Sequence, residues 1–390
     1  MNKKRLFVFA AAFLVLSAAI VYLRAERPVS AAKPVNAAHE NQGNWDDAAR
    51  YAFITDKNKP KLAVLDTYQQ HIVSVINLRA QPDYLTISRL GGFILYARAG
   101  AQFLYRLDLK TNQQEKIALA YPVSGEMVAH AEGRWLAYLG AKQVVIVDLQ
   151  TQKTVTIAVT GQVDLLYTPT GDDLFIGELT LGKLTKVDLA TQRQQVLFDL
   201  HKPISPISVM PNMMALFFAS DRDLLRYSLL NNTLENYPML PSKERPYITS
   251  ESRTLLYLGK QPNGQGQFVD KLQVVNAYTR AVTGEYALPK LADIGNKLAT
   301  GWLDQTVALA TEAGLYSIDL AGRKGKATPL SGQVIDMLVQ ADSKMLLLTR
   351  QHSHNVLFFD MQKQQIADEV DTGLQNPKQV LMGQTTSLCH

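Results

Sequence analysis

Histidine is the residue type in this chain with the clearest potential for metal chemistry, because imidazole nitrogens bind Zn²⁺ and similar ions. His352 and His354 are two positions apart, and residues i and i+2 of an extended segment project to the same side. Such a pair could hold one edge of a divalent metal, with Asp56 as a third ligand from a corresponding loop. Two solvated loop residues are the commoner outcome for this pattern. The metal site at His352 and His354 is therefore a hypothesis.

The sequence offers no other motif for catalysis or nucleotide binding. It has no nucleophile elbow, phosphate-binding loop, HExxH motif or EF-hand loop. Cys389 is the only cysteine, which excludes a disulfide framework and a cysteine-based metal site. The net charge of +5 includes Lys3, Lys4 and Arg5, and the remainder is too small to indicate nucleic-acid binding. We therefore predict no catalytic residue and no nucleic-acid partner, and no cofactor-binding residue can be named.

A short apolar run that ends in Asp-Leu-x-Thr, or a variant of it, recurs along the chain about every 40 to 48 residues. Serine or asparagine replaces the aspartate at Ser228 and Asn276. All three residue types carry a short side-chain oxygen that accepts hydrogen bonds from backbone N–H groups two or three residues on, which closes a tight turn. We therefore predict a structural turn role for six aspartates: Asp66, Asp108, Asp148, Asp188, Asp319 and Asp360.

Each repeat contains four short strands, which predicts an all-β protein. In residues 84–119, for example, the apolar runs YLTIS, FILYAR, FLYRLD and QEKIAL are separated by Gly, Asn and Thr turns. Four strands in a period of about 40–45 residues is typical of a β-propeller blade. The turn motifs predict eight blades; seven is the alternative if the blade near 247–286 is irregular. We expect the Gly- and Gln-rich insertion at 259–271 to be an exposed loop.

The two ends of the repeat region predict how the ring closes. The chain enters at residues 51–55 with a second-type strand that no first strand precedes, and it leaves at 377–383 with a first-type strand that nothing follows. The last strand can therefore complete the first blade. This pairing would leave no open edge at the junction. The propeller is predicted to span residues 51–383, with a tail at 384–390.

Residues 51–88 resemble the YVTN-type β-propeller repeat, a WD-repeat-like family related to the heavy chain of amine dehydrogenases. YAFIT stands at the Tyr-Val-Thr-Asn segment, residues 64–67 match its Val-Ile-Asp-Thr core, and Pro82 stands at its usual proline. The resemblance implies extracytoplasmic scaffolds, adhesion proteins and relatives of redox-enzyme propellers. A shared fold does not by itself transfer a function.

Three enzyme chemistries known on propellers can be compared with the sequence. Quinone-dependent enzymes place a tryptophan under the cofactor and often a cysteine pair beside it, but this chain has no cysteine pair. Lactonases need inward Glu, His, Arg or Asp residues around the channel. A haem-dependent propeller needs an axial histidine, for which His130 or His354 could serve. None of these residues stands out, so an enzyme or a carrier of a cofactor or metal is the alternative function.

The N-terminus predicts export from the cytoplasm. Residues 1–5 are basic, and residues 6–23 are eighteen residues without a charge, long enough for a transmembrane helix. The basic flank keeps the N-terminus inside, so residues 24–390 should face the periplasm. Residues 24–50 are expected to be a flexible spacer. We predict a single-pass bacterial inner-membrane protein; a cleaved signal and a soluble periplasmic protein are the alternative.

Binding is the default function for a rigid ring of loops. The loops that join second to third strands, and those that join successive blades, should share one face of the ring. We predict a candidate binding rim there with four arginines: Arg98, Arg222, Arg245 and Arg350. The main prediction is thus a non-catalytic, membrane-tethered scaffold for other periplasmic or inner-membrane proteins. No cofactor is predicted, although a divalent metal is retained as a hypothesis.

Overall fold

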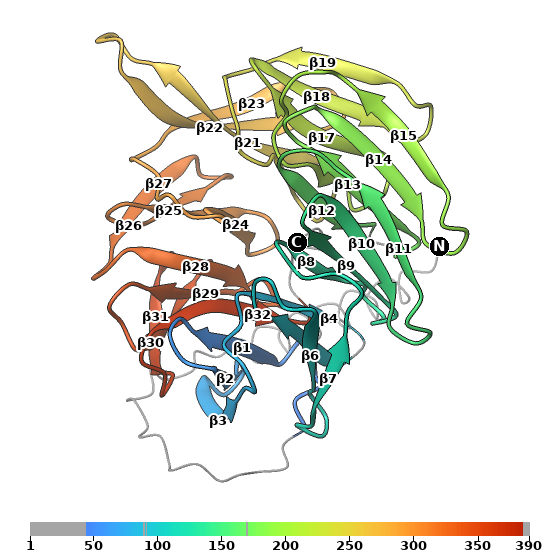
Figure 1. Cartoon of the computed structure of the whole chain (residues 1–390). Coiled ribbons are helices and arrows are strands. Elements are labelled where there is room, and N and C mark those ends of the chain that lie inside the picture. The colour runs from blue at the N-terminus through green and yellow to red at the C-terminus, as the bar shows by residue number, and fades with distance from the viewer. Residues whose placement is uncertain (1–43, 89, 91, 169–170, 385–390) are drawn as a thin grey trace, which may run out of the picture. The chain divides into compact units, whose positions relative to one another are not determined.

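The structure is a computed structural model of the chain, and it describes residues 44–88, 90, 92–168 and 171–384. These residues form eight antiparallel sheets of four strands each, and none of them lies in an α-helix. The sheets are the blades of a β-propeller (Figure 1). The predicted all-β class and the count of eight blades are confirmed.

The four strands of a blade follow one another from the centre of the ring to its edge. From the inner to the outer strand, blades 1 to 4 consist of β32 (Pro377–Met382), β1 (Tyr51–Asp56), β2 (Lys61–Asp66) and β3 (His71–Asn77); β4 (Tyr84–Ser88), β5 (Phe93–Ala97), β6 (Phe103–Asp108) and β7 (Gln114–Ala118); β8 (Met127–Ala129), β9 (Trp135–Gly140), β10 (Gln143–Asp148) and β11 (Thr154–Ala158); and β12 (Val163–Tyr167), β13 (Asp173–Glu178), β14 (Lys183–Asp188) and β15 (Gln194–Asp199).

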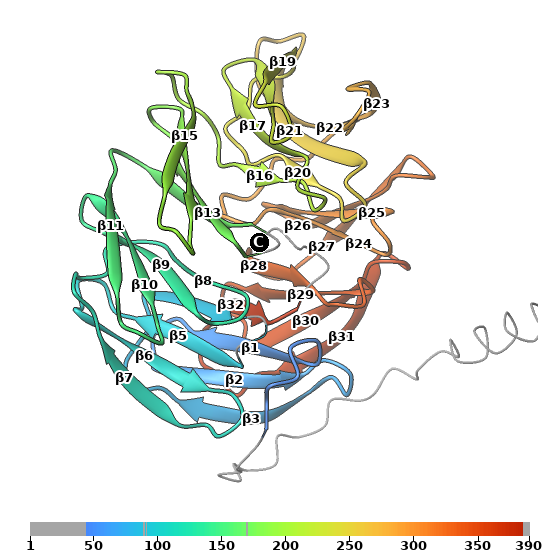
Figure 2. The same cartoon turned by 90° about the vertical axis from the view of Figure 1, so that its right-hand side faces the viewer.

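Blades 5 to 8 have the same strand order. They consist of β16 (Ser208–Val209), β17 (Ala215–Ser220), β18 (Asp223–Ser228) and β19 (Leu234–Pro238); β20 (Tyr247–Ile248), β21 (Thr254–Pro262), β22 (Phe268–Asn276) and β23 (Val282–Ala287); β24 (Leu298–Gly301), β25 (Thr306–Thr311), β26 (Gly314–Asp319) and β27 (Lys324–Pro329); and β28 (Val334–Val339), β29 (Met345–Arg350), β30 (Asn355–Asp360) and β31 (Gln365–Asp371). In Figure 2 inner strands such as β8, β28 and β32 lie near the centre, and outer strands such as β7, β11 and β31 lie at the periphery.

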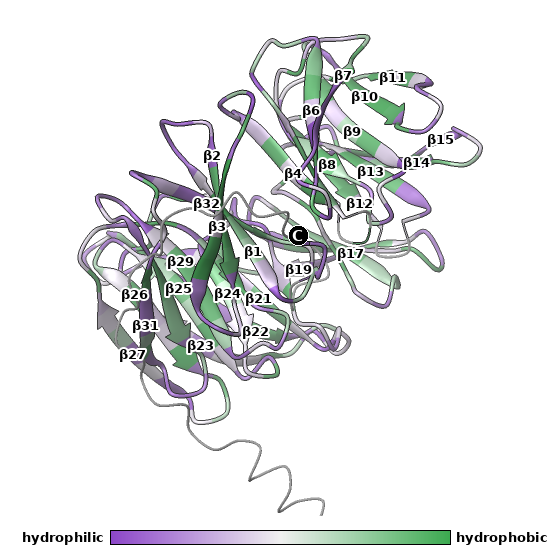
Figure 3. Cartoon of the chain, turned by 90° about the horizontal axis from the view of Figure 1, so that it is seen from below, coloured by the Kyte–Doolittle hydropathy of each residue, from purple (hydrophilic) through white to green (hydrophobic). Residues whose placement is uncertain are grey.

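The hydrophobic core lies between the blades. In β1, Ala52 and Ile54 pack in a cluster shared with blade 8, whereas Phe53 packs in a cluster shared with blade 2. This is the two-residue alternation of a strand, with apolar side chains on both faces because each face meets a neighbouring blade. Figure 3 accordingly shows hydrophobic residues concentrated in the strands and hydrophilic residues in many of the connecting turns.

The turn aspartates occupy equivalent positions in the hairpins between third and fourth strands. Oδ1 of Asp66 accepts hydrogen bonds from the N–H groups of Tyr68 and Gln69, both at 3.0 Å. Equivalent bonds occur at the other five aspartates and at Asn276. The residue four positions after each turn residue has a positive φ, for example Gln70 and Asn112. The side-chain oxygen therefore satisfies backbone donors that this compact turn leaves unpaired.

The last strand completes the first blade. β32 pairs with β1 in antiparallel register, with Phe53 opposite Leu381. Asp56, which is buried, strengthens the junction: its Oδ2 accepts hydrogen bonds from the N–H groups of Gln375 at 2.8 Å and Asn376 at 3.1 Å. The closing strand β32 is thus fixed by its pairing with β1 and by the Asp56 carboxylate, which binds the residues just before it.

Two boundaries differ from the sequence-based expectations. Residues 259–271 are not a loop throughout: β21 and β22 continue as a two-stranded ribbon, and only 263–267 lie between them. Residues 44–50, assigned to the spacer, pack on the propeller. The Trp45 side chain is buried against Tyr51, and the Trp45 backbone N–H donates to the Leu109 carbonyl at 2.7 Å. Residues 24–50 were predicted to be a spacer from their overall composition, which does not show that one tryptophan in this segment packs on the propeller.

Within the described part of the chain, no helix is long and apolar enough to cross a membrane. The predicted transmembrane segment at 6–23 lies outside the described residues, and so does most of the spacer.

Candidate functional site

The inner strands surround a cavity of about 540 Å³. Each blade has four antiparallel strands, so every inner strand begins at the same end of the ring. Charged side chains gather at that end because they lie at, or within two residues of, the start of an inner strand: Glu126, Arg245, Lys297 and Asp336 line the cavity, and Asp164 is paired with Arg245. Together with Glu244 they form the charged end of the cavity.

Arg245 and Asp164 form the central ion pair of this end. Arg245 precedes the inner strand of blade 6, and its Nη2 lies 2.6 Å from Oδ1 of Asp164 in blade 4. The other guanidinium nitrogen, Nη1, donates to the backbone carbonyl of Ile207 in blade 5, whose N–H donates to Oδ2 of Asp164 at 2.8 Å. The ion pair therefore joins blades 4 and 6, and both of its side chains also bind the backbone of blade 5. Asp164 is 5% exposed, and this arginine and the Ile207 N–H compensate its buried carboxylate.

Glu126 lies beside this pair without a cation of its own. Its Oε2 accepts a hydrogen bond from the N–H of Leu165 at 3.3 Å. The side chain is open to the water-accessible cavity, although protein surrounds the cavity on its sides. This enclosure, with the negative charge of Asp164, raises the pKa of Glu126 to about 7, against the opposing effect of Arg245. Glu126 can therefore change its protonation state near neutral pH.

Asp336 is the second carboxylate with a raised pKa. Its Oδ1 accepts from the N–H of Met337 at 3.0 Å, and its Oδ2 accepts from the N–H of Val380 at 2.9 Å. Burial raises the pKa of Asp336 to about 6, and these two N–H groups and Lys378 only partly oppose the rise. Asp336 thus ties blade 8 to the closing strand and has no ion-pair partner among the described residues.

The remaining charged side chains of the cavity are paired. Lys297 Nζ lies 3.0 Å from Oε1 of Glu244. Beside Lys297, the Asn296 amide donates to the Met337 carbonyl at 2.7 Å. Beyond the charged end the wall is mainly apolar, with Leu85, Ile87, Met127, Leu165, Leu298, Met337, Leu338 and Leu381 among its residues. The cavity therefore combines a charged end with an apolar wall, as small-molecule sites commonly do.

His130, a predicted candidate for an axial haem ligand, has both ring nitrogens engaged within the protein. Nδ1 accepts from the N–H of Glu132 at 3.3 Å, so Nε2 carries the proton and donates to the Gly171 carbonyl at 2.9 Å. The ring is 6% exposed and packs edge-on against Tyr167. In this arrangement His130 has no free nitrogen for a metal.

The hypothetical metal pair lies away from the cavity. His352 has a φ of 57°, so the segment is not extended there, and the premise that the two rings project to one side is not met. His354 Nδ1 lies 3.1 Å from the Leu374 carbonyl, and both oxygens of Asp56 accept backbone hydrogen bonds. No group of three or more His, Cys, Asp or Glu side chains suited to a metal occurs in the described residues. The metal pair stays a prediction.

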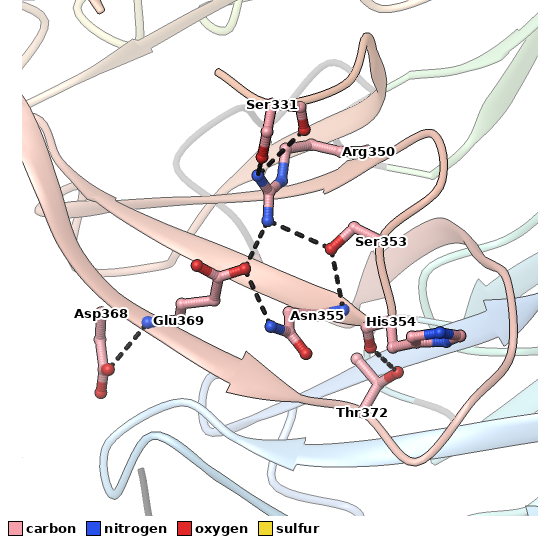
Figure 4. Close-up of polar contacts among 8 residues, drawn as sticks. All are labelled: Ser331, Arg350, Ser353, His354, Asn355, Asp368, Glu369 and Thr372. Carbon is pink, nitrogen blue, oxygen red and sulfur yellow. Dashed lines mark hydrogen bonds and ion pairs between the residues drawn. The ribbon is translucent and has the colours of Figure 1, made fainter. Parts of the chain in front are cut away.

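The four predicted rim arginines have different environments. Arg98 and Arg222 are exposed, whereas Arg245 lies in the cavity. The Arg350 side chain is only 5% exposed and contacts Ser331, Ser353 and Glu369 (Figure 4). It therefore stabilises blade 8 and is not available to a partner, which corrects its assignment to the rim. Its predicted loop position suggested exposure, but Arg350 is the last residue of β29, and its guanidinium pairs with Glu369 on the outer strand β31 of the same blade.

Sequence reasoning missed Glu126, Asp164, Lys297 and Asp336 as site residues. One signal in the sequence could have identified them. Each is a charged residue near the start of an otherwise apolar inner strand, so all of them occupy the same position within the repeat. In blades 3, 4, 6, 7 and 8, the charge at this position belongs to the charged end of the cavity.

Comparisons with known proteins support the fold. No protein-family model and no curated protein sequence matches the chain. Among solved structures, dihydro-haem d1 dehydrogenase NirN in complex with DHE matches with a TM-score of 0.64 at 11% identity, covering 86% of this chain and 76% of that chain. Kuenenia stuttgartiensis hydrazine synthase matches with a TM-score of 0.55 at 13% identity, covering 72% of this chain and 95% of that chain. Apo AztD from Citrobacter koseri matches with a TM-score of 0.58 at 14% identity, covering 85% and 96%. At these identities the likeness concerns the fold alone.

Proposed function

We propose that this protein binds a small molecule in its central cavity, and that this binding, rather than the scaffolding of other proteins, is its main function. The observation that carries the proposal is the cavity of about 540 Å³, where charged side chains from four blades line one end beside an apolar wall and Asp164 of a fifth blade pairs with one of them, Arg245. Cavities of this size hold small ligands, and a few fixed polar groups in an apolar wall provide their specificity.

The scaffold interpretation loses support from the same residues. It relied on exposed arginines on one face of the ring, but Arg350 is buried and Arg245 is paired inside the cavity. The alternative interpretation required a polar pocket at the centre of the ring with converging acidic residues, and Glu126, Glu244 and Asp336 meet that requirement. A ligand carrier or a propeller enzyme is therefore the better-supported class.

The structural neighbours favour the same class. One of them is named as a dehydrogenase in complex with DHE, and another as hydrazine synthase. Both names describe proteins that act on small molecules. Since the fold alone is shared, these names support the class of function and not a particular ligand.

The cavity does not fit a haem bound through histidine. The described histidines are at 71, 130, 201, 352 and 354, and none of them lines the cavity. The acidic excess at the charged end would also oppose the propionates of a haem. A metal bound by side chains alone lacks a third ligand in the described residues. We therefore propose an organic ligand.

The location also remains a proposal. The basic residues 1–5 and the apolar segment 6–23 support a protein anchored in the bacterial inner membrane, with the propeller in the periplasm. Partners among periplasmic or inner-membrane proteins are compatible with this location, and the exposed Arg98 and Arg222 are candidate contacts for them.

The test compares two glycine substitutions. Gly295 lines the cavity, and a Cβ there would meet no atom within 4 Å, so Gly295→Trp should fill the charged end without strain at the Cβ position. Gly264 has equally open space but lies between β21 and β22, outside the cavity lining, so Gly264→Trp is the matched control.

The full chain should be purified from its own host and examined by native mass spectrometry, absorbance and metal analysis. A bound small molecule in the wild type and in Gly264→Trp, but not in Gly295→Trp, is the expected result. Wild-type protein without any bound molecule, or equal binding in both variants, would contradict the proposal.

A further inference from the structure

We infer that the ligand of the central cavity is an amphipathic organic cation, such as a primary amine with an apolar body, and that Glu126 is the residue that binds its charged group. This inference rests on the proposed function and specifies the class of ligand.

The charges that line the cavity do not balance. Of the ionisable side chains among its described lining residues, excluding tyrosine, three are acidic and two are basic, and Asp164, which is paired with Arg245, adds a fourth carboxylate at the same end. Arg245 is paired with Asp164, and Lys297 is paired with Glu244. Glu126 and Asp336 remain without a cation. A ligand that brings a positive charge would restore the balance.

Glu126 is better placed than Asp336 to receive that charge. Asp336 uses both carboxylate oxygens to accept backbone N–H groups, which fix blade 8 to the closing strand. Glu126 uses only Oε2, and its Oε1 has no hydrogen-bond partner among the described residues. The side chain is exposed, and it lines the cavity. An ammonium group could therefore bind Oε1 without displacing an existing bond.

The cation should be organic. A divalent metal held at Glu126 would need further free oxygen or nitrogen ligands, and Asp164 is already committed to Arg245 and to the Ile207 N–H. The wall next to Glu126 continues into Met127, Val128 and Leu165. Such a wall stabilises an apolar ligand body in proportion to the apolar area that it buries.

Three probes of similar shape and different charge test this inference by isothermal titration calorimetry with the full chain at pH 8. They are phenethylamine, 2-phenylethanol and 3-phenylpropionate. We expect the amine to bind about tenfold or more tightly than the alcohol, and the carboxylate to bind most weakly, because a charge-assisted hydrogen bond contributes at least that much in an enclosed site.

Two variants test whether the preference for the amine depends on Glu126. Glu126→Gln removes the charge but keeps an amide oxygen for the Leu165 N–H, so we expect a normal fold, a loss of the amine's advantage and unchanged binding of the alcohol. Glu132→Gln makes the same charge change in the same blade, but Glu132 does not line the cavity. It should leave all three affinities unchanged.

Protonation provides a second readout. Glu126 faces Asp164 and Arg245, and the cavity also holds Asp336, Glu244 and Lys297. Lowering the pH from 8 to 5.5 should weaken amine binding by the wild type, and Glu126→Gln should remove most of this pH dependence. If titration of Asp336 caused the pH dependence of amine binding, Glu126→Gln would keep that pH dependence.

The outcomes separate this inference from the proposed function. Binding of the alcohol or the carboxylate as tight as that of the amine, or an unchanged amine affinity in Glu126→Gln, would overturn the inference and leave a ligand-binding cavity. Absence of binding of all three probes would overturn the inference, and the comparison of Gly295→Trp with Gly264→Trp would then decide whether the cavity binds a different small molecule.

Discussion

Arg245 and Asp164 lie in blades 6 and 4, and their side chains meet at 2.6 Å across the inner strand of blade 5. The guanidinium also donates to the Ile207 carbonyl of blade 5, so three blades share one polar contact. The propeller is thus linked at its centre by an ion pair as well as by the apolar clusters between its blades.

We expect Arg245→Met to destabilise the protein by roughly 2–3 kcal/mol, because it leaves the buried Asp164 carboxylate without its cation. The double variant Arg245→Met/Asp164→Asn should recover part of this loss. Urea unfolding of the two single variants and the double variant measures the coupling energy. Arg222→Met, at an exposed arginine of the same face, should change the stability little. A coupling energy near zero would show that the ion pair does not link the blades.

We expect the stability of the protein to fall as the pH rises from 5 to 8. Burial raises the pKa of Asp336 to about 6, and desolvation within the cavity together with the negative charge of Asp164 raises the pKa of Glu126 to about 7, above the values that these carboxyls have in the unfolded chain. The folded state therefore binds more protons than the unfolded state in this range, and the contribution is lost as the pH rises through the folded pKa values. For Asp336 the loss is on the order of 2 kcal/mol.

Urea unfolding across this pH range measures the effect. Asp336→Asn should be less stable at pH 5, since it loses an acceptor for a backbone N–H, but its stability should depend less on pH than that of the wild type. A stability that rises steadily from pH 5 to 8 would contradict the assignment of these raised pKa values.

Two buried tyrosines should respond in opposite ways to the loss of their hydroxyl groups. The Tyr138 hydroxyl donates to the Tyr121 carbonyl at 3.0 Å, so Tyr138→Phe should cost about 1 kcal/mol. The Tyr167 hydroxyl is buried without a hydrogen-bond partner among the described residues, so Tyr167→Phe should be neutral or stabilising. Thermal unfolding of both variants makes the comparison. An equal loss in the two variants would reveal a partner for Tyr167 outside the described residues.

Removal of residues 377–390 should prevent folding, because β1 would lose its inner partner strand and Asp336 would lose the Val380 N–H that it accepts. A chain that lacks only residues 385–390 keeps all of β32 and serves as the control. Circular dichroism and size-exclusion chromatography report the result. A folded, monomeric protein without residues 377–390 would show that closure by the last strand is dispensable.

The sequence alone determined the propeller, since its signals are local. The turn aspartates, the two-residue alternation and the four-strand period each arise within a few dozen residues, and the unmatched strands at 51–56 and 377–382 indicate closure by simple counting. The hairpin at 259–271 was misread because its Gly- and Gln-rich composition is typical of loops, although its two strands pair with each other.

The candidate site was decided only by the tertiary structure. Glu126, Asp164, Arg245 and Asp336 belong to four blades, and more than 200 residues separate the first from the last. Each resembles an ordinary charged loop residue until the ring brings the starts of the inner strands together. Whether such a residue meets a partner, as Arg245 does, or keeps an oxygen free, as Glu126 does, depends on distances across the ring. A periodic pattern carries no information about these distances, because the same repeat can place a charge in solvent or in an enclosed cavity.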